Sequence, residues 1–350
     1  MSDEEKGIEI EKIPSEIEDE ETELPIYKIV SYPADPTLEV LYQKWQRGEI
    51  KIESFQRGWV WKQAQASRLI DSFLSGLPVP EIFVYKEPSS QKWILIDGQQ
   101  RLRTICGFFE GKLPDGSKFN LRGISSKWKN QYYKDLNETD SVRFRDSVLR
   151  VIIVEQQDPR DDTSIYHIFE RLNTGGTQLK AQEVRNCIYH GPFNDFLRGL
   201  NEDSAWREIV GVEKTDTHMR DVELIVRFLA LLERGDSYRK PMKLFLNKYM
   251  KRHRKETKPK LYESAFLNTV NKVLKSLGRK PFHIKRGINA AVFDCVMIAF
   301  AQSTKTPRDI KVRFRKLLAN KSFVEAISLH TTDEDKVATR MKLARKILFK

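Results

Sequence analysis

The sequence has few of the features that mark extracellular, zinc-binding or thiol-dependent proteins. Its three cysteines, Cys106, Cys187 and Cys295, are far apart, and no CxxC pair is present. This spacing provides neither a disulfide framework nor a zinc clip, and it fits a reducing compartment. The six histidines are scattered and form no HExxH pattern or paired spacing. They therefore indicate no histidine-based metal site.

Long hydrophobic runs are also missing. The most apolar stretch, residues 288–300, contains Asn289 and Asp294 and is too short to cross a bilayer. It predicts a buried helix instead. Residues 1–25 have no apolar core of the kind that a signal peptide needs. We therefore expect a cytoplasmic protein with no membrane partner.

Charge is abundant but unevenly distributed. The chain of 350 residues has a formal net charge of +12, whereas residues 1–25 contain eleven acidic residues and only two basic ones. We expect these 25 residues to be a disordered acidic tail that either folds back on the basic body or only aids solubility. The basic remainder favours a polyanion partner such as nucleic acid, and a lysine-rich solvated surface is the alternative.

The apolar pattern predicts two folded domains, an α+β domain at residues 26–200 and an all-helical domain at 201–350. Helices of the first are expected at 37–47, 62–75, 98–110, 164–172 and 180–190, and strands at 82–85, 93–96 and 149–154. Helices of the second are expected at 222–233, 242–254, 261–277, 287–302, 307–319 and 333–349. No strong strand pattern follows residue 200.

The sharpest local signal is the sequence DGQQR at residues 97–101, where an apolar strand turns directly into a helix. A helix start presents free backbone N–H groups and a positive dipole end. Gly98 permits close approach to the backbone, and Arg101 offers forked donors for phosphate oxygens. These features predict a phosphate site, although Asp97 and Gln100 alone also fit a capping box without any ligand. The segment is not a P-loop, because GxxxxGK[ST] does not occur.

Two weaker motifs flank this segment. Residues 56–61, QRGWVW, could bind a nucleotide by stacking and charge, or their tryptophans could simply fill the core. In residues 168–177, Glu170 and Asn173 lie on one face of a predicted helix and could hold Mg²⁺. The alternative for this segment is an ordinary helix end, after which Glu183 starts the next helix.

The predicted helical domain carries clusters of basic residues. Residues 239–260 contain ten Lys or Arg and a single acid, and further clusters lie at 311–316 and 340–346. Such clusters predict salt-sensitive contacts with DNA phosphates, and a solvated helix face is the alternative. The residues that we expect to bind DNA are Lys251, Arg252, Arg254, Lys255, Lys311, Arg313 and Arg315.

In their order along the chain, the three motifs resemble the N-terminal domain of the GmrSD-type restriction family, also called domain of unknown function 262. The resemblance covers residues 37–195, and its most specific part is the DGQQR segment followed by Thr104. It implies a ParB/sulfiredoxin-like fold for the α+β domain. It also implies a nucleoside-triphosphate-hydrolysing subunit of a DNA-restriction or antiphage defence system, acting against phage DNA that is often modified.

The resemblance further implies site residues, cofactors and partners. The nucleotide site would contain Gln56, Arg57, Asp97, Gly98, Gln99, Gln100, Arg101, Thr104 and Asn173, with Asp97, Gln100 and Arg101 in the catalytic role. Glu170 and Asn173 would hold Mg²⁺ beside GTP, ATP or CTP. Full-length family members often carry a C-terminal HNH-type nuclease domain, and the helical region of this sequence contains no clustered His/Asp/Asn motif that resembles it. We therefore expect a separate nuclease partner and no nuclease activity of this chain alone, with homo-oligomerisation left open.

Two other functions remain open at this stage. One is a non-catalytic DNA-binding module that senses a modification, which the basic helical half supports. The other is a ParB-like nuclease acting alone, which needs a metal cluster that the sequence does not offer. No obvious base for an attacking water is present, so nucleotide binding without turnover is compatible with the sequence.

Overall fold

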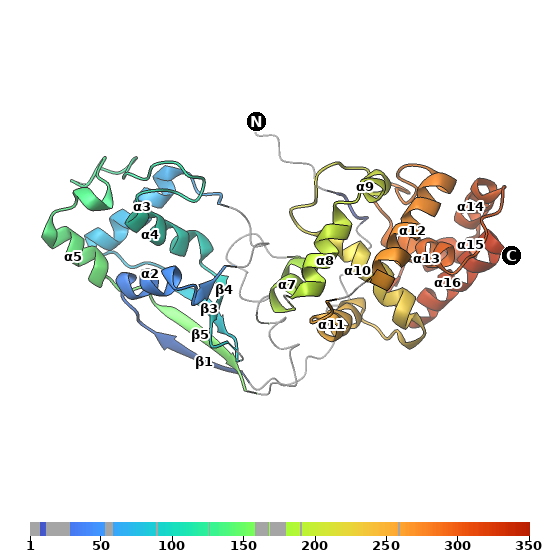
Figure 1. Ribbon diagram of the computed structural model, residues 1–350, viewed down its shortest axis with the longest axis horizontal. Helices are drawn as coiled ribbons and strands as arrows, with labels where there is room; N and C mark the ends of the chain where they lie inside the picture. Colours follow the sequence, from blue (N-terminus) through green and yellow to red (C-terminus); the bar gives the residue numbers. More distant parts are fainter. Residues whose placement is uncertain are drawn as a thin grey trace. The chain divides into compact units, whose positions relative to one another are not determined.

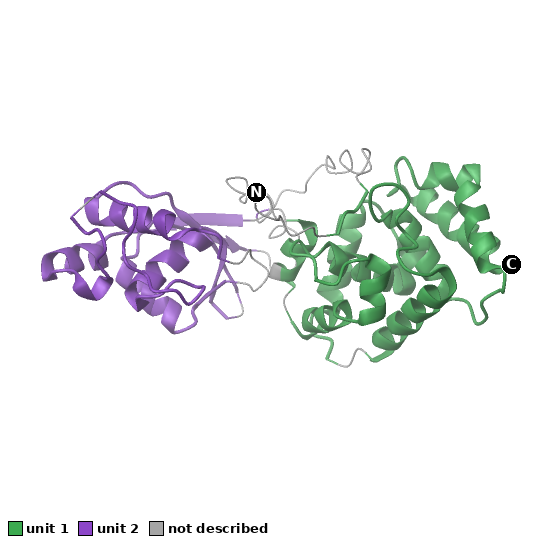
Figure 2. Cartoon of the chain, turned by 90° about the horizontal axis from the view of Figure 1, so that it is seen from above, with its two compact units in different colours: residues 1–25, 179–350 green, residues 26–178 purple. Residues whose placement is uncertain are grey.

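The computed structural model describes residues 8–11, 29–52, 59–88, 90–125, 127–157, 168, 180–189, 191–257 and 260–350. The chain divides into two compact units, shown in different colours in Figure 2. The mixed unit comprises residues 26–178, and the helical unit comprises residues 1–25 and 179–350. The expected combination of an α+β fold with a helical C-terminal region is confirmed.

The mixed unit is built on a five-stranded sheet in the order β1-β5-β3-β4-β2. The strands are β1 (Ile29–Ala34), β2 (Ile50–Lys51), β3 (Ile82–Lys86), β4 (Trp93–Asp97) and β5 (Val151–Gln156). β3 is antiparallel to β4 and parallel to β5, β1 is antiparallel to β5, and β2 is parallel to β4. The three predicted strands are the central ones, which are buried and apolar. β1 and β2 were missed because edge strands carry a weaker apolar signal, and β2 has only two residues.

Four helices of the mixed unit lie on one side of this sheet (Figure 1). They are α2 (Leu38–Gln46), α3 (Gln63–Ser75), α4 (Gln99–Glu110) and α5 (Glu138–Asp146). α2 begins where expected because Thr37 Oγ1 accepts a hydrogen bond from Val40 N at 3.3 Å. α3 and α4 end at Gly76 and Gly111, both in the left-handed conformation that terminates helices. α5 was not predicted, because its sequence is mostly polar and buries little besides Phe144.

The helical unit surrounds one almost completely buried helix, α13 (Ala290–Ala301), which confirms the buried helix expected at 288–300. Helices α10, α12 and α16 pack against it. The described helices of this unit are α7 (Ala181–Ile188), α8 (Pro192–Asn201), α9 (Ser204–Val210), α10 (Arg220–Arg234), α11 (Met242–His253), α12 (Lys260–Leu277), α13, α14 (Ile310–Ala319), α15 (Lys321–Ala326) and α16 (Glu334–Phe349). Among the described residues, no helix combines the length and apolarity needed to span a membrane.

The boundary between the units lies after residue 178, whereas we expected it after residue 200. Helices α7 and α8 pack against α10, and α7 also packs against α11. The buried Arg185 of α7 donates hydrogen bonds to Asn247 Oδ1 and Glu223 Oε2, both at 2.9 Å. These contacts join residues far apart in sequence. Local periodicity therefore did not reveal which unit α7 belongs to.

Part of the predicted acidic tail is ordered against the helical unit. Ile10 pairs with Ile288 in a parallel bridge, and Glu11 N donates to Ile288 O at 3.0 Å. Ile288 N donates to Glu9 O at 2.7 Å, and Ile8 is buried. The prediction of disorder is therefore wrong for residues 8–11, where two isoleucines interrupt the acidic sequence. The rest of the predicted tail lies outside the described residues.

Two arginines converge on one buried carboxylate at the centre of the helical unit. Asp294 of α13 accepts hydrogen bonds from Arg227 Nε at 3.0 Å and Arg227 Nη2 at 2.6 Å. Arg340 Nη2 of α16 donates to the same carboxylate at 3.2 Å, and both Asp294 and Arg340 are fully buried. A buried charge is costly unless it is paired. The pairing therefore fixes α10, α13 and α16 relative to one another.

We expect Asp294→Asn to lower the free energy of unfolding by about 3–5 kcal/mol, because it leaves buried guanidinium groups without a counter-charge. Denaturant unfolding followed by circular dichroism measures this change. Asp309→Asn is the matched control, because the Asp309–Arg313 ion pair lies at the surface and should contribute little. Equal destabilisation by the two substitutions would show that Asp294 has no special structural role.

Candidate functional site

The DGQQR segment forms the turn between β4 and α4. Gly98 is the N-cap residue of α4, with φ of 95° in the left-handed region that favours glycine. A Cβ atom at this position would lie 2.2 Å from Ile82 Cγ2 and 2.8 Å from Ile82 Cβ. Glycine is therefore required both by the positive φ and by the close contact with Ile82. The group that approaches the Gly98 backbone is the side chain of Ile82, the first residue of β3.

Asp97 and Arg101 are joined across this turn. Arg101 Nη2 donates to Asp97 Oδ2 at 2.8 Å and to Glu81 O at 3.0 Å. The capping-box interpretation is wrong, because Gly98 occupies the N-cap position and α4 has no side-chain cap. The Asp97 carboxylate instead orients the Arg101 guanidinium. The Asp97 and Arg101 side chains remain 38% and 19% exposed, so both are accessible from solvent.

Gln100 connects the helix start to the second motif. Its Oε1 atom accepts hydrogen bonds from Val60 N at 3.3 Å and Trp61 N at 3.4 Å. Thr104 is fully buried, and its Oγ1 donates to Gln100 O at 2.7 Å. Thr104 therefore supports the turn from beneath, where a ligand could not reach it directly. The structure thus brings two of the three sequence motifs together.

The tryptophans of the second motif belong to the edge of the core. Trp59 and Trp61 are partly buried against the core of the mixed unit, and their rings meet edge to face with centroids 6.4 Å apart. This arrangement supports the packing role that was the alternative for these residues. Gln56 and Arg57 lie outside the described residues, although the chain that follows them is held beside Gln100.

Two N–H donors at the start of α4 are buried and have no hydrogen-bond partner among the residues that the structure describes. They are Gln99 Nε2 and Arg101 Nε. A buried donor without an acceptor costs free energy, so each such atom in a native structure requires an explanation. An anion at the first turn would supply acceptor oxygens, and the positive end of the α4 dipole favours the same kind of ligand. Arg103 follows on the same helix, where burial lowers the pKa of its guanidinium.

Metal and thiol chemistry find no support among the residues that the structure describes. Within them, no group of three or more His, Cys, Asp or Glu side chains could hold a metal ion. Glu170 and Asn173, the expected Mg²⁺ ligands, lie outside the described residues. Burial raises the pKa of the Cys106 and Cys295 thiols, so neither is an activated nucleophile.

A second polar cluster, which the sequence analysis missed, surrounds the start of α7. Glu183 is buried, and its Oε2 atom accepts a hydrogen bond from Lys180 N at 2.6 Å and lies 3.4 Å from His218 Nδ1. Burial raises the pKa of the Glu183 carboxyl group. Arg220 holds the neighbouring Asp216 through two bonds of 2.6 and 3.0 Å. The role of Glu183 at a helix start was recognisable from sequence, but its contact with His218 spans 35 residues.

The residues expected to bind DNA lie in two places on the helical unit. Lys251 and Arg252 are exposed near the end of α11, with Arg254 and Lys255 directly after it. Lys311, Arg313 and Arg315 lie on α14. Of these, Arg313 forms a surface ion pair with Asp309, whose two carboxylate oxygens lie 2.9 and 3.0 Å from Arg313 Nε.

We expect Gly98→Ala to destabilise the mixed unit more than Gly48→Ala. Both glycines have positive φ, but a Cβ atom at Gly48 would have no neighbour within 4 Å. The clash with Ile82 should therefore add about 1–3 kcal/mol to the backbone strain that the two substitutions share. Thermal unfolding of the two variants measures the difference. Equal midpoints would mean that the β3 contact does not constrain the turn.

Part of this chain, including the turn at Gly98, matches a known protein family. Residues 38–190 match the model of the family described as GmrSD restriction endonuclease, N-terminal domain. The match confirms the resemblance inferred from the motifs, and the matched range contains the β4–α4 turn together with residues 56–61 and 168–177. No curated protein matches the chain.

Proposed function

Because residues 38–190 match the GmrSD N-terminal domain family, we propose that this chain is a nucleotide-binding subunit of a DNA-restriction or antiphage defence system. It would act on DNA, including modified phage DNA, together with a nuclease on a separate chain. The observation that carries the nucleotide assignment is the start of α4, a helix N-terminus where two buried donors, Gln99 Nε2 and Arg101 Nε, have no hydrogen-bond partner among the described residues. Oxygen-rich phosphate groups fit this set of donors.

The phosphates would lie at the first turn of α4. Their oxygens would accept hydrogen bonds from the first backbone N–H groups of the helix and from Arg101. Arg101 is already oriented by Asp97 and by Glu81 O, so it would lose little conformational freedom on binding. Asp97 would then act as a positioning residue, and Gln100 would hold residues 60 and 61 beside the site.

Hydrolysis of the nucleotide requires a group that activates or orients water. The Asp97 carboxylate is committed to Arg101, which favours slow hydrolysis or binding without turnover. A non-catalytic sensing module is therefore the second candidate. Hydrolysis of GTP, ATP and CTP by the purified chain, with and without DNA, separates the two functions. A plasmid-nicking assay with the chain alone tests the third function, an independent nuclease.

We expect Arg101→Ala to weaken nucleotide binding about 10- to 150-fold, because a charged phosphate partner typically contributes about 1.5–3 kcal/mol. Isothermal titration calorimetry with each triphosphate measures the affinity, and circular dichroism checks the fold. Arg47→Ala is the matched control, because Arg47 also forms an ion pair in the mixed unit, with Glu49 at 2.7 Å, but lies away from α4 in sequence. A folded Arg101 variant with unchanged affinity and turnover would refute the phosphate site.

Mg²⁺ would neutralise part of the phosphate charge and would be held by Glu170 and Asn173. We expect Glu170→Gln to weaken the Mg²⁺ dependence of nucleotide binding more than the metal-free affinity, because a hard cation prefers a charged oxygen ligand. Mg²⁺ titrations of the variant and of Glu138→Gln, an acidic residue at the start of α5, provide the comparison. Identical curves for both variants and the wild type would remove Glu170 from the metal site.

A further inference from the structure

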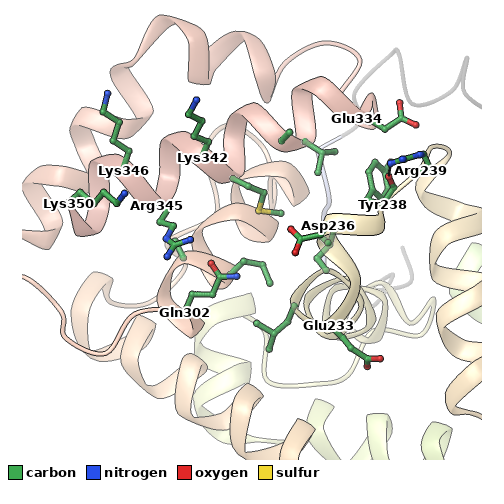
Figure 3. A pocket seen from close by; sticks show the side chains of 18 residues that line it. Glu233, Asp236, Tyr238, Arg239, Gln302, Glu334, Lys342, Arg345, Lys346 and Lys350 are labelled. Carbon is green, nitrogen blue, oxygen red and sulfur yellow. Dashed lines mark hydrogen bonds between the residues drawn. The ribbon is translucent and has the colours of Figure 1, made fainter.

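The helical unit contains a cavity of about 730 Å³ between α10, α13 and α16. Its lining includes the apolar residues Leu231, Ile298 and Val337. One wall is formed by α16, and the 3₁₀ turn η4 (Gly235–Ser237) lies opposite. Figure 3 shows Arg345 directed toward Gln302, while Lys342 and Lys346 extend away from the other labelled side chains. The cavity thus has a strongly basic side.

Four cations form this side, which we call the α16 basic ridge: Lys342, Arg345, Lys346 and Lys350. They lie along the last turns of α16 and at its end, and all four are exposed. Within the part of the chain that the structure describes, none of the four forms an ion pair. Other basic residues nearby are neutralised, since Lys336 pairs with Glu325 at 2.6 Å and Lys240 with Asp333 at 2.9 Å.

The ridge lies on a rigid support. Arg340, on the buried face of α16, is bound to Asp294 of α13, and Val337, Ala344 and Leu348 are buried on the same helix. Lys342, Arg345 and Lys346 therefore project from a fixed helix, and Lys350 directly follows it, so that little backbone freedom is lost when a ligand binds.

We infer that the α16 basic ridge binds the sugar-phosphate backbone of duplex DNA. From Lys342 to its last residue, Phe349, α16 rises about 11 Å, at about 1.5 Å per residue, and Lys350 follows directly. Phosphates of one DNA strand recur every ~3.4 Å along the duplex axis, so four cations match about three or four phosphates. The cavity lining also includes the acidic residues Asp236 and Glu334, which disfavour entry of a phosphate into the cavity itself.

This inference rests on the DNA role in the proposed function and selects among the basic clusters of the helical unit. Three ridge residues belong to the 340–346 cluster noted in the sequence, and the ridge is better suited than the two clusters from which the expected DNA-binding residues came. Arg313 is already bound to Asp309, and Lys251 and Arg254 also have interaction partners within the protein. Contacts with phosphate groups carry no sequence information, so the ridge provides affinity and register and leaves base recognition to other residues.

The test is DNA binding by the full chain across a salt series, measured by fluorescence anisotropy on two unrelated duplexes. Replacing all four ridge cations with Ala should weaken binding equally on both duplexes. The slope of log affinity against log salt should flatten by about 3–4, at about 0.9 for each lost phosphate contact. The matched control replaces Lys251, Arg252, Arg254 and Lys255 with Ala, which should leave most of the slope intact.

A second variant covers the case in which the quadruple substitution unfolds the helical unit. Lys342→Gln with Lys346→Gln keeps most of each side chain and should flatten the slope by about 2. The inference is overturned if the folded ridge variants keep the affinity and slope of wild type while the control variant at residues 251–255 loses DNA binding. The proposed function would stand in that case. If wild type binds neither duplex, the DNA role itself fails, whereas nucleotide binding is judged separately by calorimetry.

An acidic protein partner is the remaining occupant that the ridge could take. The same variants are therefore titrated with a polyglutamate peptide. If the ridge variants lose peptide binding but retain full DNA binding, the ridge binds an acidic protein instead and the inference is overturned. Loss of DNA binding with a flattened slope supports it.

Discussion

The close contact between Gly98 and Ile82 is the constraint on which the candidate site depends. No other residue type fits at this position, because a Cβ atom would overlap Ile82 and the backbone has positive φ. The contact presses the start of α4 against β3, and it thereby places Arg101 within reach of Glu81 O, which directly precedes that strand. The hydrogen bond to Asp97 then fixes the guanidinium group at the first turn. The residues of the DGQQR segment thus have separate roles: Gly98 sets the turn, Asp97 orients Arg101, and Gln100 joins the helix start to residues 60 and 61. Arg101 is the residue that we propose contacts the nucleotide phosphates.

A different constraint organises the helical unit. One buried carboxylate, Asp294, accepts hydrogen bonds from arginines of two other helices, so the cost of burying it is offset only when all three helices are assembled. The same arrangement gives α16 one face that is locked into the core and another that carries four cations into solvent. The proposed nucleotide and DNA sites therefore belong to separate units, each held by its own buried interactions. Communication between the two sites would require coupling between the units.

The match to the GmrSD family ends at residue 190, beyond the boundary between the units at residue 178. The matched range therefore includes α7, which packs in the helical unit through Arg185 and supplies the buried Glu183. The matched range therefore covers most of the mixed unit and also α7 of the helical unit. The boundary expected after residue 200 was too late because the periodicity of α7 and α8 does not show which unit these helices pack in.

The sequence by itself determined the features that depend on neighbouring residues. Thr37 starts α2 through a local hydrogen bond, and Gly76 and Gly111 end α3 and α4 in the left-handed conformation. The apolar runs of the central strands and of α13 are also local patterns. It also identified the strand-to-helix turn at Gly98, because that motif is continuous. Only the tertiary structure decided the partners: Arg101 with Glu81 O, Gln100 with residues 60 and 61, Glu183 with His218, Ile10 with Ile288, and Asp294 with two arginines. Each of these contacts except the first joins residues more than 30 positions apart, and Arg101 and Glu81 are separated by 20. Capping and periodicity act within a few residues, whereas these pairings arise only when separate elements share one core.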